Sequence, residues 1–346
     1  MKSSPPQMLP MGRVTLPCVP LVRRLSCGLF FSVLVGAQVQ AASIYVTNEG
    51  PNPNSPTASS VSVYTSTGTF VNNLVPTTPY VYPDAIAVDS ALNVYVADAS
   101  ANRVVEFNSA GTQIHVFNTD SGSGYSPCGL AVDPAGNVYV ASLDGVIQKI
   151  SGGAVTNIGT VDGTVRGITY DPYNGLLYAT TQYPGDVYTM PTSGGTATLF
   201  ASNIGSGDLR GLAFGNGNLY VSDTNSGPAN GAIYEFAGDS SSPTLLASGL
   251  QGPNYIAVDS LGQLLVAEYY GNDVLELSAD GTDLGSLITG LDGPSGLALD
   301  PSGQQQTTPE PANWILTGLG GVALIFGSAV RRRFRDPSIK STRRSG

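Results

Sequence analysis

The chain has 346 residues, of which 41% are hydrophobic and 12% charged, with 43 glycines, 24 prolines and a formal net charge of −10. Residues 42 to 308 hold four basic residues against 23 acidic ones, a formal charge of −19, because eleven of the fifteen Lys and Arg lie in the terminal segments. Such an acidic domain repels nucleic acid and anionic lipid, which argues against both as partners. The charge suits a soluble extracellular protein that could gather divalent cations, and it equally suits a domain that is acidic for solubility.

The N-terminal segment has the pattern of a secretory signal peptide. Arg13, Arg23 and Arg24 precede an apolar run from Leu25 to Ala37, and small residues follow at Val39-Gln40-Ala41. This order of basic, apolar and small residues is typical of an exported protein, with cleavage expected after Ala41 and with Ala37 and Ala42 as alternative sites. Translation could begin at Met1 or at Met11. Removal of the leader would leave Cys128 as the one cysteine, so no intramolecular disulfide is expected.

A short apolar phrase recurs six times with a period near forty residues, which predicts a repeat architecture. It reads Ile86-Ala87-Val88-Asp89, Leu130-Ala131-Val132-Asp133, Ile168-Thr169-Tyr170-Asp171, Leu212-Ala213-Phe214-Gly215, Ile256-Ala257-Val258-Asp259 and Leu297-Ala298-Leu299-Asp300. A Gly/Asn-rich turn and three further short strands follow most copies, and four such strands make one propeller blade.

The two ends of the array complement each other. Residues 44–47, 61–64 and 70–74 read as a second, third and fourth strand without a first, whereas Gly296 to Asp300 reads as a first strand alone. Joining them makes a composite blade and leaves no open sheet edge. We therefore predict an all-β, six-bladed β-propeller over residues 42–303, closed by this composite N-/C-terminal blade.

The repeats resemble the NHL type. The resemblance rests on Pro127-Cys128-Gly129-Leu130-Ala131-Val132-Asp133, on Gly136-Asn137-Val138-Tyr139-Val140-Ala141 and on Asn102-Arg103-Val104. It spans nearly the whole predicted domain and implies the fold. It leaves function open, because the family includes binding scaffolds, lyases and lactonases.

Two positions in each repeat are expected to ring one channel mouth. The first, five residues before the end of the phrase, holds Asp84, Cys128, Arg166, Arg210, Asn254 and Ser295. The second, near the end of the second strand, holds Asn48, Asp98, Ser142, Thr181, Asp223 and Glu268. Arg166 and Arg210 are two of the four basic residues of the domain, and two guanidinium groups could clamp a carboxylate or sulfate such as that of a uronic acid. The alternative is that each arginine pairs with a nearby acid, Asp162 or Asp208 for example.

The sequence gives a ligand-binding hypothesis and a metal-site hypothesis for this mouth. The ligand site would comprise Arg166, Arg210, Asp84 and Asn254. The metal site would use Asp98, Asp223 and Glu268 for a Ca²⁺-like ion, as the resemblance to six-bladed lactonases and hydrolases implies; no other cofactor and no catalytic residue is predicted. Several tyrosines near loops, among them Tyr82, Tyr255, Tyr269 and Tyr270, could stack on sugar rings. The single histidine, His115, lies on an expected outer strand, which excludes histidine-based zinc sites and Ser-His-Asp triads.

The C-terminal segment has three consecutive parts. Pro309-Glu310-Pro311 precedes an uncharged apolar stretch from Ala312 to Val330, and Arg331, Arg332 and Arg333 follow. The stretch is long enough to cross a bilayer as a helix, and the arginines should stay on the cytoplasmic side. This tail resembles the PEP-CTERM sorting signal of Gram-negative bacteria that make extracellular polysaccharide. The resemblance implies that a membrane enzyme of the exosortase type recognises the Pro-Glu-Pro box.

These observations predict a signal peptide (1–41), a propeller (42–303), a linker with the Pro-Glu-Pro box (304–311), a transmembrane helix (312–330) and a basic cytoplasmic tail (331–346). The protein is expected to cross the inner membrane, to be anchored at least transiently, and to reach the cell surface or biofilm matrix. There its channel mouth would bind extracellular polysaccharide or surface proteins. The sequence favours a non-enzyme, with a metal-dependent hydrolase or lactonase and a purely structural matrix protein as alternatives.

Overall fold

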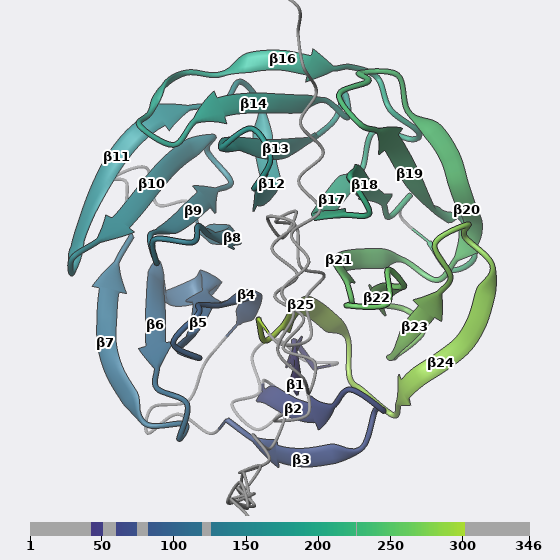
Figure 1. Ribbon diagram of the computed structural model, residues 1–346, viewed down its shortest axis with the longest axis horizontal. Coiled ribbons are helices and arrows are strands. Elements are labelled where there is room, and N and C mark those ends of the chain that lie inside the picture. The colour runs from purple at the N-terminus through teal and green to yellow at the C-terminus, as the bar shows by residue number, and fades with distance from the viewer. Residues whose placement is uncertain (1–42, 51–59, 75–81, 120–125, 226, 302–346) are drawn as a thin grey trace, which may run out of the picture. The chain divides into compact units, whose positions relative to one another are not determined.

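The computed structural model describes residues 43–50, 60–74, 82–119, 126–225 and 227–301, which form six β-sheets arranged around a central channel (Figure 1). The expected signal peptide, linker, Pro-Glu-Pro box, apolar stretch and basic tail lie outside these ranges. Within them, no helix is long and apolar enough to cross a membrane. The predicted six-bladed β-propeller is confirmed.

Five blades are continuous in sequence. They comprise β4–β7 (Pro83–Val88, Val94–Asp98, Arg103–Phe107, Gln113–Asn118), β8–β11 (Pro127–Val132, Val138–Ser142, Val146–Ser151, Ala154–Thr160), β12–β14 with β16 (Thr164–Tyr170, Leu176–Gln182, Val187–Pro191, Thr198–Ala201), β17–β20 (Leu209–Gly215, Asn218–Asp223, Gly231–Ala237, Thr244–Leu250) and β21–β24 (Pro253–Val258, Leu264–Glu268, Asp273–Leu277, Asp283–Thr289). A short strand, β15 (Gly195–Thr196), adds to the outer edge of β11, and one 3₁₀ turn, η1 (Ala99–Ala101), follows β5.

The sixth blade is the predicted composite. Its order is β25 (Pro294–Leu299), β1 (Ser43–Asn48), β2 (Ser60–Thr65) and β3 (Phe70–Asn73). The pairing of β25 with β1 places Ile44 opposite Leu299 and Val46 opposite Leu297. The Ser43 backbone N–H also donates to Asp300 Oδ2 at 2.7 Å. The strands at the two ends of the domain therefore pair with each other. Closure of the ring depends on contacts between residues more than 250 positions apart in sequence.

The aspartate at the end of the repeated phrase closes the turn that follows. Asp133 Oδ1 accepts the backbone N–H groups of Ala135 and Asn137, and its Oδ2 accepts Asn137 Nδ2 and the Tyr139 hydroxyl at 2.8 Å. Burial raises the pKa of Asp133, but these hydrogen bonds outweigh it, so the pKa lies below its usual value. Asp89 has the same four kinds of contact in the preceding blade. These recurring aspartates are therefore explained by turn geometry.

Candidate functional site

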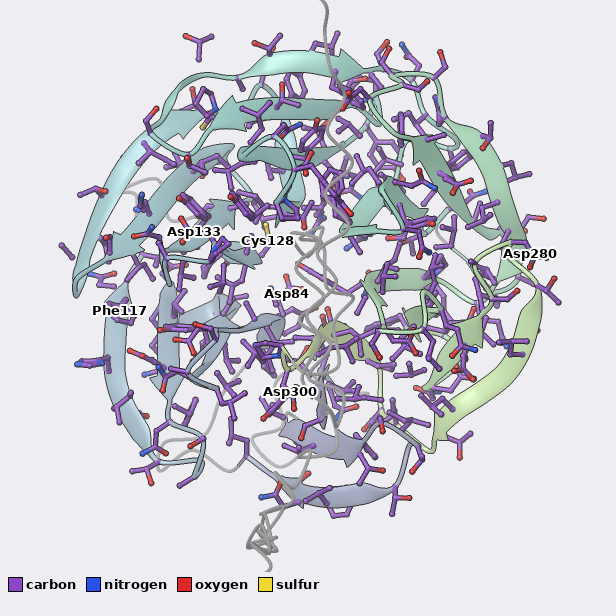
Figure 2. The ribbon with its side chains drawn as sticks, viewed as in Figure 1. Asp84, Phe117, Cys128, Asp133, Asp280 and Asp300 are labelled. Carbon is purple, nitrogen blue, oxygen red and sulfur yellow. The ribbon has the colours of Figure 1, made fainter. Side chains whose placement is uncertain are left out.

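A polar cavity of about 430 Å³ opens at the mouth where the first strands begin. Its lining includes Glu49, Tyr82, Asp84, Arg166, Arg210, Thr224, Asn254, Tyr269 and Tyr270. Figure 2 shows Asp84 near the centre of the ring, whereas Phe117 and Asp280 lie at its outer strands. The four residues of the ligand-binding hypothesis thus line one cavity, together with three of the tyrosines.

The two arginines belong to one hydrogen-bonded chain. Arg166 donates through Nε and Nη2 to Gln182 Oε1, at 2.9 and 2.6 Å. Gln182 Nε2 in turn donates to Asp208 Oδ1 at 2.7 Å, and Arg210 Nε donates to the same oxygen at 3.1 Å. Arg210 therefore has the acid partner that the alternative reading named, while Arg166 is held by a neutral amide. In both arginines, Nε donates one of the hydrogen bonds that hold the guanidinium in place.

The carboxyl groups around the cavity stabilise the charged form of Arg210. Burial lowers the pKa of Arg210, but Asp208, Asp84 and Glu49 outweigh it and raise the pKa above its usual value. The Arg210 guanidinium is therefore charged at every relevant pH, with 27% of the side chain exposed. A held, permanently charged guanidinium that still reaches solvent is suited to binding an anion.

Asp84 and Glu49 place two carboxyl groups on the same cavity. The Ser295 hydroxyl donates to Asp84 Oδ1 at 2.9 Å. Burial raises the pKa of Asp84, against the opposing effects of Ser295, Arg210 and Arg166. Burial and the nearby Asp84 raise the pKa of Glu49 to about 7, although Tyr82, Ser295 and Arg210 act in the opposite direction.

The channel is blocked below this cavity by Tyr255. Its hydroxyl, carried by β21, donates a hydrogen bond to the Cys128 carbonyl on β8, and it lies 3.3 Å from the Arg166 carbonyl on β12. These three strands come from three blades, so the side chain spans the channel. The neighbouring Asn254 lines the polar cavity, whereas Tyr255 lines a second, apolar one. The polar cavity is consequently a pocket with a tyrosine floor.

Cys128 does not point into the polar cavity. Its thiol is buried, with Sγ 3.1 Å from the Val165 carbonyl oxygen and 3.4 Å from the Ala141 carbonyl oxygen. Burial raises the pKa of the thiol, with a further contribution from Asp84. His115 lies on the outer strand β7, where its Nδ1 is 2.8 Å from Glu106 Oε2. Neither residue is placed to activate a nucleophile at the mouth.

Asp98, Asp223 and Glu268, which were predicted at the second rim position, are not among the residues that line the polar cavity. Asp98 accepts Arg103 Nε and Nη2 at 2.9 and 2.7 Å, and Asp223 accepts the Ser206 backbone N–H and hydroxyl at 2.5 Å. Glu268 Oε1 accepts the Gln251 backbone N–H at 2.7 Å. Each carboxyl of the metal hypothesis is thus engaged within its own part of the ring.

The reason is a one-residue difference in register. Asp98 lies opposite Pro83, Asp223 opposite Leu209 and Glu268 opposite Pro253, each the residue before the inner rim position. Opposed residues share a face of the sheet, and adjacent residues point to opposite faces. The residues that reach the mouth are therefore the next ones along the chain, namely Glu49, Ala99, Leu143, Thr224 and Tyr269, with Gln182 joining through Arg166.

Among the described residues, no group of three or more His, Cys, Asp or Glu side chains is arranged to hold a metal ion. Asp98, Asp223 and Glu268 are thus not gathered into such a group, and the metal site stays a prediction. Their hydrogen bonds help to fix the loops at the mouth.

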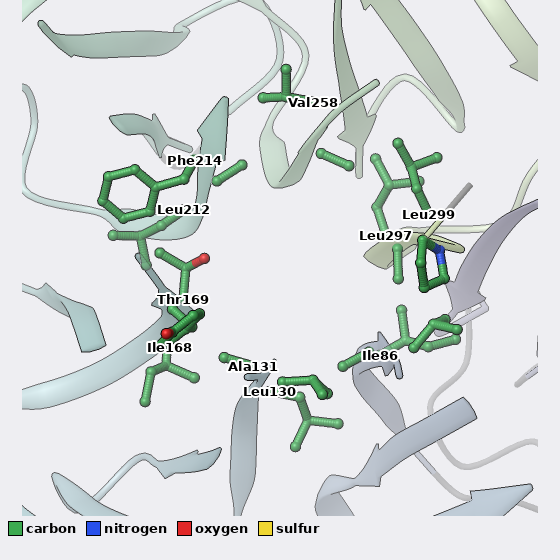
Figure 3. Close-up of a pocket in the computed structure, with 18 of the residues that line it drawn as sticks. Ile86, Leu130, Ala131, Ile168, Thr169, Leu212, Phe214, Val258, Leu297 and Leu299 are labelled. Atoms are coloured by element: carbon green, nitrogen blue, oxygen red, sulfur yellow. The ribbon is translucent and has the colours of Figure 1, made fainter. Parts of the chain in front are cut away.

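The opposite mouth is an apolar cavity of about 320 Å³. Figure 3 shows Ile86, Leu130, Ile168, Leu212, Val258 and Leu297 converging on it from the first strands of all six blades. Its polar lining includes Asp89 and Asp133, which are already engaged in the turns described above. The groups able to orient a polar ligand are therefore concentrated at the other mouth.

Comparison with known proteins supports the propeller fold, but it assigns neither a family nor an activity. No protein-family model matches the chain, and no curated protein matches it. A chain in the crystal structure of a nidogen/laminin complex is similar over 76% of this chain and 99% of its own length, with 18% identity and a TM-score of 0.62. A streptogramin B lyase structure is similar over 74% of this chain and 91% of its own, with 14% identity and a TM-score of 0.57.

One of these neighbours belongs to a nidogen/laminin complex and the other is a lyase. At such low identity the likeness shows a shared propeller and does not transfer a site. The functional argument therefore rests on the residues of the polar mouth.

Proposed function

We propose that this protein is an exported binding protein whose polar channel mouth holds an anionic ligand, in the first instance the carboxylate groups of an extracellular polysaccharide. The observation that carries the proposal is the placement of Arg166 and Arg210 in one cavity with Tyr82, Tyr269 and Tyr270. Guanidinium groups bind carboxylates with charge-assisted hydrogen bonds, and tyrosine rings offer flat apolar faces for sugars.

The terminal segments support the cellular part of the proposal. The N-terminal pattern directs export, and the Pro-Glu-Pro box, apolar stretch and arginines resemble a PEP-CTERM signal processed by an exosortase-type enzyme. The repeats resemble the NHL type. The protein would be anchored in the inner membrane at least transiently and then occupy the cell surface or biofilm matrix, with polysaccharide or surface proteins as partners.

Calorimetry of the propeller, residues 42–306, with an acidic exopolysaccharide of a bacterium that makes this protein tests the proposal. Saturable binding that survives removal of calcium is the expected result. Binding that requires calcium would instead favour the metal-dependent alternative, and an absence of binding to acidic polysaccharide would contradict the proposal and favour a structural matrix role.

A further inference from the structure

The geometry points to a Ca²⁺ site between Glu268 and Asp273, the residues that flank the connection from β22 to β23. The site differs from the metal site predicted at the channel mouth, because both of its carboxyls belong to one hairpin. It goes beyond the proposed function and does not rest on it, since neither carboxyl lines the polar cavity.

The Glu268–Asp273 hairpin has a close counterpart in the first continuous blade, between β5 and β6. In both hairpins four residues connect the strands, and the fourth is an asparagine with a positive φ, 50° at Asn102 and 57° at Asn272. The flanking residues are opposed across the strands in both cases, Asp98 with Arg103 and Glu268 with Asp273. The two hairpins can therefore be compared residue by residue.

The Asp98–Arg103 hairpin carries its own cation. Arg103 donates through Nε and Nη2 to Asp98 Oδ2, at 2.9 and 2.7 Å, so a guanidinium neutralises the buried carboxylate. In the other hairpin Asp273 takes the place of the arginine and stands opposite Glu268. Like charges directly opposite each other destabilise an antiparallel pair. A bound cation would supply the charge that Arg103 supplies in the first hairpin.

Two carboxyl oxygens of this pair converge on one place. Asp273 is 9% exposed; its Oδ2 accepts the Ser286 hydroxyl, and its Oδ1 is buried without a hydrogen-bond partner among the described residues. A β-carbon on Gly271 would lie 2.6 Å from this Oδ1 and 3.1 Å from Glu268 Oε2. Because a buried acceptor without a partner is costly, the space beside Gly271 is where we expect a ligand.

Gly271 keeps this space open. Its φ is not positive, so the backbone conformation does not require a glycine, and the corresponding residue of the Asp98–Arg103 hairpin is Ala101. The missing side chain instead leaves room between the two carboxyls.

Ca²⁺ is the cation that suits such a place. It binds carboxylate oxygens at about 2.3–2.6 Å, accepts irregular geometry and completes its shell with carbonyl oxygens and water, whereas Mg²⁺ demands a near-ideal octahedron. With two carboxylates we expect a Kd on the order of 10⁻⁴–10⁻³ M, the range of extracellular modules. Binding requires ionised carboxylates, so the pKa of Glu268, which burial raises to about 7, describes the calcium-free protein.

The ion would stabilise the loop that carries two tyrosines of the polar cavity. Tyr269 and Tyr270 lie in the connection, and their backbone N–H groups donate to the carbonyls of Gly252 and Gln251 at 2.9 and 3.0 Å. These bonds hold the loop without an ion. Removal of calcium should therefore lower stability and leave the binding of acidic polysaccharide in place.

Thermal unfolding of the full chain in a mild non-ionic detergent, at about pH 8, tests the site with calcium, magnesium or EGTA present. About 10 mM calcium should raise the Tm by roughly 2–8 °C over EGTA, and the same concentration of magnesium should raise it less. Asp273→Asn should abolish the increment due to calcium. Asp239→Asn is the matched control and should keep it, because Asp239 is exposed at a turn of another blade.

Two further variants separate the site from a general effect of charge. Gly271→Ala keeps both carboxyls but fills the space between them, so it should lose the calcium increment. Asp273→Arg places on this hairpin the cation that the other one has, so it should raise the Tm in EGTA and remove the response to calcium.

An equal calcium increment in the native protein, Asp273→Asn and Gly271→Ala would assign the effect to the acidic surface and overturn the site. A native Tm that calcium raises no more than magnesium would also overturn it, and would leave a proton as the partner of the buried oxygen. Neither result would bear on anion binding at Arg166 and Arg210.

Discussion

The hydroxyl of Tyr255 on β21 donates a hydrogen bond to the carbonyl of Cys128 on β8, 127 residues away in sequence and on another blade. This contact crosses the central channel and divides it into a polar pocket and an apolar one. It also joins blades that share no strand pairing. The site at the mouth therefore rests on a floor supplied by the side chain next to Asn254.

Replacement of Tyr255 by phenylalanine should destabilise the propeller while leaving its shape intact. The change leaves the buried carbonyl of Cys128 without its donor, which costs about 1–3 kcal/mol. Differential scanning calorimetry should record a Tm lower by roughly 2–10 °C. Tyr173→Phe, at a residue 54% exposed, is the control and should change the Tm little.

The carboxyls of Asp98 and Asp223 should act independently of each other. Asp98 is buried and bonded to Arg103 of its own blade, and Asp223 is buried and bonded to Ser206 in the connection before β17. Asp98→Asn and Asp223→Asn should therefore each cost about 1–3 kcal/mol. Urea unfolding of the double variant should give the sum of the single effects within about 0.5 kcal/mol. Strong coupling, together with a calcium-dependent stability that both variants lose, would instead support the predicted metal site.

Stability should fall as the pH rises from about 4.5 to about 7. Burial raises the pKa of Glu268 from 4.5 to about 7, with Asp273 adding to the effect and the Gln251 N–H opposing it. The native state therefore binds more protons than the unfolded chain in this window, and stability is lost as the pH rises through it. Glu49 shifts in the same direction.

The contribution of Glu268 can be isolated by substitution. Glu268→Gln should flatten the pH profile of the unfolding free energy by about 1–2 kcal/mol, a figure reduced for partial solvent screening. The raised pKa of Glu268 would be contradicted by an unfolding free energy that rises between pH 4.5 and pH 7 and that Glu268→Gln does not change.

Closure of the ring should depend on β25. A chain that stops after Gly303 retains the strand that pairs with β1, whereas one that stops after Gly293 exposes the β1 edge and the apolar faces of Ile44 and Val46. We expect cooperative thermal unfolding for the first, followed by circular dichroism, and aggregation or non-cooperative melting for the second. Equal stability of both would contradict closure by the composite blade.

The architecture could be predicted from the sequence because each blade repeats a local pattern. The phrase ending at Asp89 or Asp133 marks a buried strand and a closed turn, and the missing strands at one end match the extra strand at the other. Such signals are local and recur six times, so no long-range information was needed to count the blades.

The mouth was predicted only in part, because the face on which a side chain lies depends on pairing register. The irregular step between Pro83 and Ile86 puts Asp98 opposite Pro83, so the residue that reaches the cavity is one later than expected. Glu49 was missed for this reason. The role of Tyr255 could not be inferred either, because its partners come from other blades.

The most direct test compares two variants of equal net charge in calorimetry with an acidic bacterial exopolysaccharide. Arg166 and Arg210 line the cavity, whereas Lys149 lies outside it. Arg166→Gln with Arg210→Gln should abolish saturable binding while the fold remains. Lys149→Glu lowers the net charge by the same two units elsewhere and should preserve binding. Equal loss in both variants would show that net charge, rather than the channel mouth, governs the interaction, and would contradict a binding site at the mouth.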